Sequence, residues 1–227
     1  KKVPGAVGST YEIPRLGIPE LVVSDGPAGL RLGGTFSGVK AVYATAFPIP
    51  AAMASTWDLD LLNKVGVAMG AESKAFGVDV LLGPAFNIKR DPLNGRNFEY
   101  LTEDPYLNGR LAASIVKGIQ SEGVGVSIKH YAVNNQETNR MSINEVVSER
   151  ALREIYLSAF EYVVKNSDPW TVMSSYPKIN GTHGAQNKYL LTDILKNEWK
   201  FNGFVMSDWF AVKDAVAAVN AGNDLIM

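Results

Sequence analysis

The residues best suited to chemistry close a short apolar run near the end of the chain, Gly203-Phe204-Val205-Met206-Ser207-Asp208-Trp209. Such a run is typical of a parallel strand buried on both faces, and ligands meet the carboxyl ends of such strands. We therefore expect the Asp208 carboxylate at the mouth of a site, with the Trp209 indole beside it. This pairing suits carbohydrate chemistry, because a carboxylate stabilises developing positive charge while a ring packs on a sugar face. The alternative is that Asp208 caps the helix that follows.

Further polar side chains stand at expected strand ends or in the loops just after them. Lys129 and His130 are adjacent, and successive strand residues point to opposite faces, so both reach one pocket only if the backbone bends at the strand's exit. The alternative is a solvated Lys129 and a His130 whose polar atoms are satisfied in the core. Arg96 and Arg140 lie in loops rich in amide and carboxylate groups, which together suit hydroxyl binding. The alternative for either arginine taken alone is an ordinary loop charge. The full set of candidates is Asp25, Arg96, Lys129, His130, Arg140, Tyr176, Asp208 and Trp209.

These side chains need a scaffold that brings distant parts of the chain together. Short apolar runs alternate with amphipathic stretches, which predicts a parallel α/β sheet. Strands are expected at 21–25, 51–57 (the weakest), 78–84, 125–130, 170–176, 203–206 and 224–227. Helices are expected at 58–77, 106–121, 148–166, 189–199 and 211–221, and irregular loops at 35–43, 87–105, 134–144 and 178–188. Polar residues end nearly every strand, which favours a (β/α)8-like TIM barrel, incomplete or irregular at its first strands, over an open doubly wound sheet.

Composition excludes several classes of function. The 227 residues carry 22 Lys plus Arg against 23 Asp plus Glu, a net charge of -1, so no basic excess attracts nucleic acid or an anionic membrane. There is no Cys and only two His, without metal-ligand spacing, so neither a metal nor another cofactor is expected. No apolar run approaches the roughly 20 residues that span a bilayer, and residues 1–10 lack the apolar stretch of a signal peptide. The compartment stays open.

Four motifs in order along the chain carry a family resemblance. They are Ser24-Asp25-Gly26-Pro27-Ala28-Gly29-Leu30-Arg31, Gly95-Arg96-Asn97-Phe98-Glu99-Tyr100 through Glu103-Asp104-Pro105, Lys129-His130, and Met206-Ser207-Asp208-Trp209. Together they resemble glycoside hydrolase family 3, in its β-glucosidase branch. The resemblance implies that Asp208 is the catalytic nucleophile and that Trp209 lines the same sugar subsite. It also implies that the hydroxyls of the terminal sugar are bound by Asp25, Arg96, Lys129, His130, Arg140 and Tyr176.

The chain departs from the family pattern in one important respect. Family β-glucosidases continue into an α/β sandwich domain that carries the acid/base glutamate, and nothing here resembles that part, so residues 1–227 are expected to form only the barrel domain. The N-acetylglucosaminidase branch does not fit, because no Pro-Gly-His follows Lys129-His130. The expected activity is retaining hydrolysis of terminal non-reducing β-D-glucosyl residues, weak in the isolated chain because general acid catalysis is typically worth about 10²–10⁴-fold.

Chemical logic agrees with the assignment to Asp208. A nucleophilic carboxylate must stay ionised, and the cations of Lys129, Arg96 and Arg140 are expected to favour its charged form. Two alternatives stay open: a silent carbohydrate-binding barrel or scaffold module, and a Schiff-base lyase that uses the Lys129 amine. The sequence leaves the sugar open among glucose, xylose and galactose.

Overall fold

A six-stranded sheet forms the centre of the computed structural model, which describes residues 3–34 and 38–227. Its strands follow the order β1-β2-β5-β6-β8-β11, and all neighbours are parallel except β1 and β2. Within the described residues the sheet ends at β1 on one side and at β11 on the other, so the predicted barrel is incomplete. The strands are β1 (Gly8–Ser9), β2 (Val22–Asp25), β5 (Val80–Leu82), β6 (Gly125–Tyr131), β8 (Thr171–Ser174) and β11 (Phe204–Ser207).

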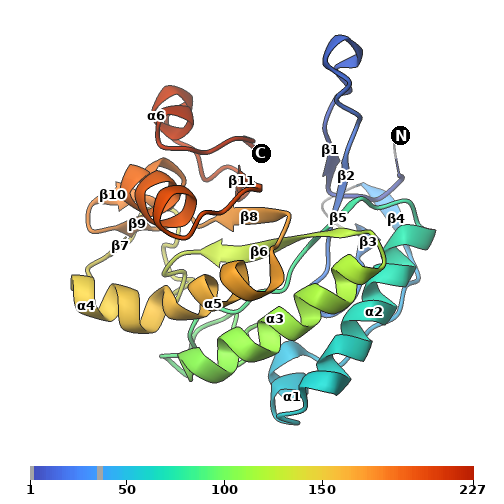
Figure 1. The fold of residues 1–227 in the computed structure, drawn as a ribbon, viewed down its shortest axis with the longest axis horizontal. Helices are drawn as coiled ribbons and strands as arrows, with labels where there is room; N and C mark the ends of the chain where they lie inside the picture. Colours follow the sequence, from blue (N-terminus) through green and yellow to red (C-terminus); the bar gives the residue numbers. More distant parts are fainter. Residues whose placement is uncertain (1–2, 35–37) are drawn as a thin grey trace.

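Helices cover the outer face of this sheet, with α2, α3 and α5 side by side (Figure 1). The Asp58 and Asp104 carboxylates accept backbone N–H groups at the first turns of α2 and α3, which fixes where these helices begin. A π-helical segment, Leu152–Tyr156, joins α4 to α5, and a second one, Tyr189–Glu198, stands where a helix was predicted. The α-helices are α1 (Pro50–Ala54), α2 (Leu59–Ala75), α3 (Pro105–Ser121), α4 (Glu149–Ala151), α5 (Ser158–Ser167) and α6 (Ala215–Asn220).

Strand alternation divides the core between the two faces of the sheet. The outer-facing residues, such as Val22 and Ile128, join the large cluster beneath the helices. A smaller cluster on the inner face contains Val23, Val80, Leu82, Met173 and Met206. Because side chains two residues apart share a face, Asp25 follows Val23 on the inner side and Asp208 follows Met206. The same alternation that buries the core thus aims both carboxylates into the barrel interior.

Shorter strands form two further small sheets. A hairpin pairs β3 (Leu32–Gly34) with β4 (Val39–Val42), and β7 (Asn144–Glu145), β9 (Lys178–Ile179) and β10 (Thr182–His183) form a three-stranded sheet. Residues 11–19 are all exposed and form an arm that projects from the body beyond β1 and β2 (Figure 1). The arm contains a 3-10 turn, Pro14–Leu16, and is closed by hydrogen bonds between the backbones of Ile13 and Ile18.

Several expected elements differ in the structure. The strand predicted at 51–57 is wrong: Pro50 opens helix α1 there, because proline is favoured in the first helical turn, where its missing N–H costs nothing. The loop predicted at 178–188 instead contains β9, β10 and a 3-10 turn, Gly184–Gln186. The loop predicted at 35–43 contains β4, while its residues 35–37 lie outside the described part.

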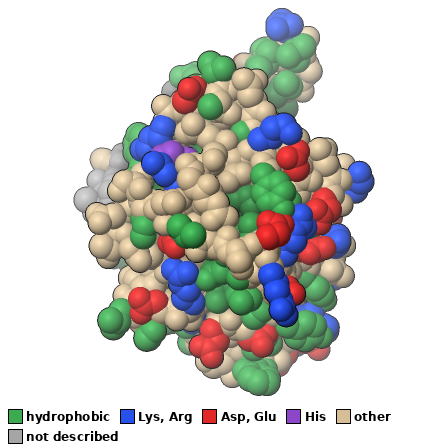
Figure 2. All heavy atoms as spheres, turned by 90° about the vertical axis from the view of Figure 1, so that its left-hand side faces the viewer, with side chains coloured by type: hydrophobic (Ala, Val, Ile, Leu, Met, Phe, Trp, Pro, Cys, Tyr) green, Lys and Arg blue, Asp and Glu red, His purple; other side chains and the backbone are tan. Residues whose placement is uncertain are grey.

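The end of the chain also differs from expectation. Helix α6 begins only at Ala215, because Asp214, not an earlier residue, caps it. The segment predicted as a last strand joins β11 through a single parallel bridge between Met206 and Leu225. The helices of the described residues include none that is long and apolar enough to cross a membrane. On the face shown in Figure 2, basic and acidic side chains are interspersed.

Candidate active site

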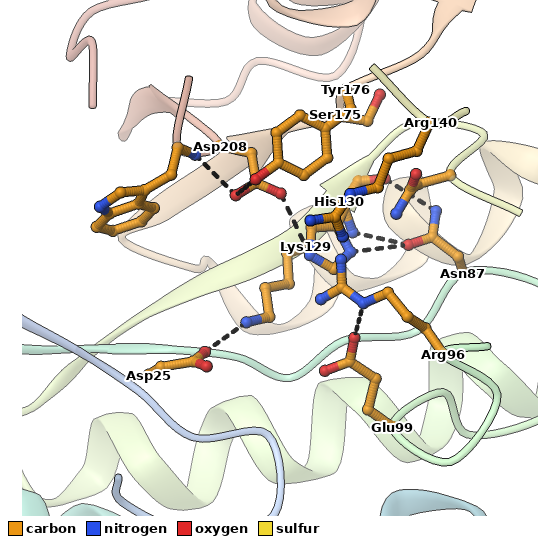
Figure 3. Close-up of polar contacts among 12 residues, drawn as sticks. Asp25, Asn87, Arg96, Glu99, Lys129, His130, Arg140, Ser175, Tyr176 and Asp208 are labelled. Carbon is orange, nitrogen blue, oxygen red and sulfur yellow. Dashed lines mark hydrogen bonds and ion pairs between the residues drawn. The ribbon is translucent and has the colours of Figure 1, made fainter. Parts of the chain in front are cut away.

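The end of β6 brings two adjacent basic side chains to one place. Pairing with β8 shifts register between Ile128 and Tyr131, so the regular alternation of the strand is interrupted there. Lys129 Nζ donates to Asp25 Oδ1 at 2.7 Å, and His130 Nε2 lies 3.6 Å from Asp208 Oδ2 (Figure 3). Both residues therefore face the same site. Lys129 is buried, so the alternative of a solvated Lys129 is wrong.

Asp208 is almost fully buried, and its two oxygens have different surroundings. Oδ1 accepts hydrogen bonds from the Tyr176 hydroxyl at 2.9 Å and from the Trp209 backbone N–H at 2.8 Å. Oδ2 faces His130. The helix-cap alternative is wrong, because the next helix is capped by Asp214. One oxygen is thus held in place while the other faces the histidine.

Burial dominates the ionisation of Asp208. It raises the pKa of this carboxyl, and the opposing effects of Lys129, the Tyr176 hydrogen bond and Arg96 do not reverse the direction. The expected effect of the cations is present, since Lys129 and Arg96 both favour the charged form, but burial is the larger effect. Lys129 and Arg96 also each donate to another carboxylate.

Asp25 lies in the opposite situation. Burial raises its pKa, but the charge and hydrogen bond of Lys129, with the charges of Arg31 and Arg96, outweigh that effect and lower it. Arg31 also makes a direct ion pair with Asp25. Asp25 is therefore a firmly ionised acceptor, suited to fixing sugar hydroxyls. The Lys129 amine is committed to this ion pair, which gives no support to a Schiff-base role.

His130 is neutral in this setting. Burial, followed by the charges of Arg96, Lys129 and Arg140, lowers its pKa well below the usual value. The contact between His130 and Asp208 is therefore not an ion pair. A neutral imidazole offers one donor and one acceptor, which suits recognition of a hydroxyl group.

The two predicted arginines approach the site from different loops. Arg96 makes an ion pair with Glu99, and Arg140 donates to Glu137 Oε2 at 2.7 Å. The guanidinium carbon of Arg140 lies 4.5 Å from the centroid of the Tyr176 ring, a cation–π stack. The close-up shows both guanidinium groups next to His130 (Figure 3).

Trp209 has a mixed environment. Its side chain is partly buried against the inner apolar cluster, and its backbone N–H supports Asp208. These contacts position the residue beside the carboxylate, as the sequence predicts. Its role as a sugar platform stays a prediction.

Three site residues escaped the sequence-based set: Asn87, Glu99 and Glu137. Asn87 Oδ1 accepts a hydrogen bond from the backbone N–H of His130 at 2.8 Å, and Asn87 Nδ2 donates to the His130 carbonyl at 2.9 Å. These two bonds fix the backbone of His130 at the end of β6. Glu99 and Glu137 each pair with an arginine three residues away. That spacing was visible in the sequence, whereas the Asn87 contact joins residues 43 apart and carries no local signal. Within the described part of the chain, no group of three acidic, His or Cys side chains could hold a metal ion.

Comparison with known proteins identifies the family of the chain. Residues 9–227 match the family model described as the glycosyl hydrolase family 3 N terminal domain. The chain is 52% identical over 222 residues to thermostable beta-glucosidase B of Acetivibrio thermocellus, covering 96% of this chain and 29% of that protein. It is 53% identical over 216 residues to an exo-alpha-(1->6)-L-arabinopyranosidase of Bifidobacterium longum, covering 93% and 28%.

A solved structure is equally similar. Beta-glucosidase 3B from Thermotoga neapolitana, in complex with alpha-D-glucose, superposes with a TM-score of 0.95 at 56% identity, covering 100% of this chain and 32% of that one. The chain therefore spans under a third of the length of these relatives. The strands, the order of the motifs and the family match lead to one conclusion: the chain belongs to the N-terminal domain family of glycosyl hydrolase family 3.

Proposed function

We propose that this chain forms the sugar-binding and nucleophile-bearing barrel of an enzyme that hydrolyses terminal non-reducing β-D-glucosyl residues with retention of configuration. The observation that carries the proposal is the environment of Asp208. Its Oδ1 is held by the Tyr176 hydroxyl and the Trp209 N–H, and its Oδ2 faces neutral His130. A buried carboxylate with one fixed and one available oxygen is suited to attack an anomeric carbon.

The chemistry follows the double-displacement scheme. Oδ2 of Asp208 forms a bond to C1 of the sugar while the bond between C1 and the leaving oxygen breaks, and an acid protonates that oxygen. Water then attacks C1, displaces Asp208 and gives its proton to the same acid/base group. We assign this group to a glutamate on an α/β sandwich domain, since relatives more than three times the length of this chain have room for one. No cofactor takes part.

The remaining side chains would bind and orient the sugar. Asp25, ionised beside Lys129, is suited to accept two hydroxyl hydrogen bonds. Lys129, Arg96 and Arg140 are donors, and neutral His130 supplies a donor or an acceptor. Hydrogen bonds that strengthen as the sugar flattens toward an oxocarbenium ion lower the barrier by several kcal/mol.

Relatives at similar identity are named for two sugars, and the two differ in an informative way. The α-L-arabinopyranosyl and β-D-glucosyl groups share equatorial substituents at C1, C2 and C3; they differ at C4, and the arabinosyl group lacks C6. We propose the glucosyl group as the substrate. Comparing aryl β-D-glucoside with aryl α-L-arabinopyranoside tests this choice, and a higher kcat/KM for the arabinopyranoside would reverse it.

The decisive experiment traps the nucleophile. The chain is incubated with 2,4-dinitrophenyl 2-deoxy-2-fluoro-β-D-glucopyranoside, a probe that needs little acid assistance, and its intact mass is measured. We expect one glycosyl adduct, mapped to Asp208 and absent from Asp208→Asn. An adduct on another residue would overturn the assignment. Glucose binding by a folded chain that forms no adduct would favour the silent carbohydrate-binding module.

A further inference from the structure

Glu137 lies between two guanidinium groups that belong to different loops. Its Oε2 accepts from Arg140 Nη1 at 2.7 Å, and its Oε1 lies 4.0 Å from Arg96 Nη1. Oε1 also accepts from the Asn134 side-chain amide at 3.3 Å. Arg96 belongs to the loop between β5 and α3, and Arg140 to the loop after β6. Glu137 is therefore a charged link between these two loops at the site, beside the hydrogen bonds of Tyr100 with Asn134.

The position of Glu137 is restricted by packing as well as by charge. A Cβ atom placed on Gly95 would lie 3.8 Å from both Cβ and Cγ of Glu137, which is ordinary contact distance, so the stem of the glutamate lies over the loop that presents Arg96. The Glu137 side chain is only 22% exposed. The carboxylate thus reaches Arg140 from a supported stem rather than from solvent.

Glu137 places a negative charge among the positive charges of the site. Arg96, Arg140 and Lys129 bring three positive charges toward one site, and all three lower the pKa of His130. Two guanidinium groups on either side of one site repel each other, and a carboxylate between them offsets this repulsion. The pKa of Arg96 is raised despite its burial, and Glu137 is among the charges responsible.

The effect of Glu137 extends toward the proposed nucleophile through contacts already described. Arg140 stacks on the ring of Tyr176, and the Tyr176 hydroxyl donates to Asp208 Oδ1. Glu137 itself is separated from Asp208 by both of these side chains. We propose that Glu137 is a positioning residue that holds Arg96 and Arg140 in the orientation that binds the sugar; this inference rests on the proposed function.

The test compares Glu137→Gln with Glu137→Asp, using the inactivation kinetics of the fluoroglucoside probe. Gln keeps the shape but loses the charge, whereas Asp keeps the charge. For Glu137→Gln we expect Ki for the probe to rise roughly ten- to hundredfold, as for loss of a hydrogen bond to a charged group, while the limiting rate ki changes less than about threefold. Glu137→Asp should restore most of the affinity. The control is Glu154→Gln, which removes an exposed ion pair with Arg150 and should change neither constant.

A double substitution identifies the route. If Glu137 acts through Arg140, then Glu137→Gln combined with Arg140→Gln raises Ki little more than Arg140→Gln alone. Effects that multiply, an unchanged Ki in Glu137→Gln, or equal losses in the Gln and Asp variants would each overturn the inference.

A second measurement separates this inference from the proposed function. The Nε–H signals of Arg96 and Arg140 are recorded by ¹⁵N NMR without any sugar. We expect the Arg140 signal to broaden or exchange faster in Glu137→Gln than in the unsubstituted chain or in Glu154→Gln, and the Arg96 signal, whose Nε–H donates to Glu99, to change less. Unchanged signals would refute the positioning role even in a chain that the probe labels. Failure of the unsubstituted chain to bind or react with the probe would instead count against the proposed function, while the NMR result still decides the role of Glu137.

Discussion

The ends of β2 and β11 present the same side chain in the same orientation, yet with opposite electrostatics. Asp25 and Asp208 each follow an apolar residue of the inner cluster by two positions. Asp25 is surrounded by cations, which lower its pKa despite burial, whereas Asp208 is held by a hydroxyl and a backbone N–H, and burial raises its pKa. This difference shows that the fold determines where a carboxylate lies, whereas its direct partners determine in which direction its pKa is shifted. A carboxylate committed to ion pairs binds; one held by neutral donors is available to react.

The largest expected effect separates the two aspartates by reaction. Asp208→Asn should reduce the rate of probe labelling by roughly 10⁴-fold or more, since it removes the attacking oxygen while Asn Oδ1 still accepts from Tyr176 and Trp209. Asp25→Asn should weaken probe binding and leave the adduct on Asp208. Intact mass and peptide mapping check both. Labelling of Asp208→Asn at the unsubstituted rate would end the distinction between the two strand ends.

The next effect concerns the cation that both aspartates share. Lys129→Met removes the buried partner of Asp25 and leaves it only the exposed Arg31, so it should cost about 3 kcal/mol of the free energy of unfolding, as for a broken buried ion pair. Urea denaturation measures it. The matched control is Lys165→Met, which removes an exposed pair with Glu161 and should cost under about 0.5 kcal/mol. Equal costs would mean that the pair at the site behaves like a surface pair.

A smaller effect tests the neutral donors around Asp208. Tyr176→Phe removes the hydroxyl hydrogen bond, which lowers the pKa of Asp208, so the pKa should rise further. The acid limb of the labelling rate should move to higher pH, and the rate at neutral pH should fall roughly tenfold. The pH dependence of labelling in both forms provides the measurement. A limb that stays in place would show that the Tyr176 hydroxyl does not influence this pKa.

The smallest effect is the stability gained when Asp208 is neutralised, and its sign is opposite to that of the loss at Asp25. The pKa of Asp25 is lowered from 3.8, so its stabilising contribution is present above that value and is lost as pH falls through the folded-state pKa. The pKa of Asp208 is raised from 3.8, so its ionisation destabilises the fold as pH rises through the folded-state pKa. At pH 7, Asp208→Asn should therefore raise the free energy of unfolding by about 1 kcal/mol. Asp25→Asn should lower it by about as much as Lys129→Met, because both substitutions break the same ion pair. Thermal unfolding at pH 7 and pH 3 checks this, and shifts of the same sign at pH 7 would refute it.

Much of this arrangement could be predicted from the sequence. Apolar runs that end in polar residues located β2, β5, β6, β8 and β11, and strand alternation explains why their last side chains converge. Both side chains face the site only if the backbone bends at Lys129-His130. The sequence alone does not decide between this bend and a solvated Lys129 with a core His130. Pairing between β6 and β8 decides it, and pairing register is a property of two strands rather than of one.

The rest depends on contacts between distant segments. Charges near Asp208 can be counted in a sequence, and Lys129 and Arg96 do favour its charged form as predicted, but the burial that outweighs them cannot be read from a sequence. Asn87 was missed because its partner, His130, lies 43 residues away. The strand expected at 51–57 is a helix for a local reason: a Pro at the first helical position outweighs a short apolar run.

The exposed arm of residues 11–19 has a practical consequence. The chain contains no cysteine, so Leu16→Cys would introduce its single thiol, at a residue that is 54% exposed on a turn with no buried residues. Exposed loop tips tolerate such changes well, because little packing is lost. A fluorophore attached there would report tumbling and association of the molecule through its anisotropy, from a position that projects away from the sheet (Figure 1).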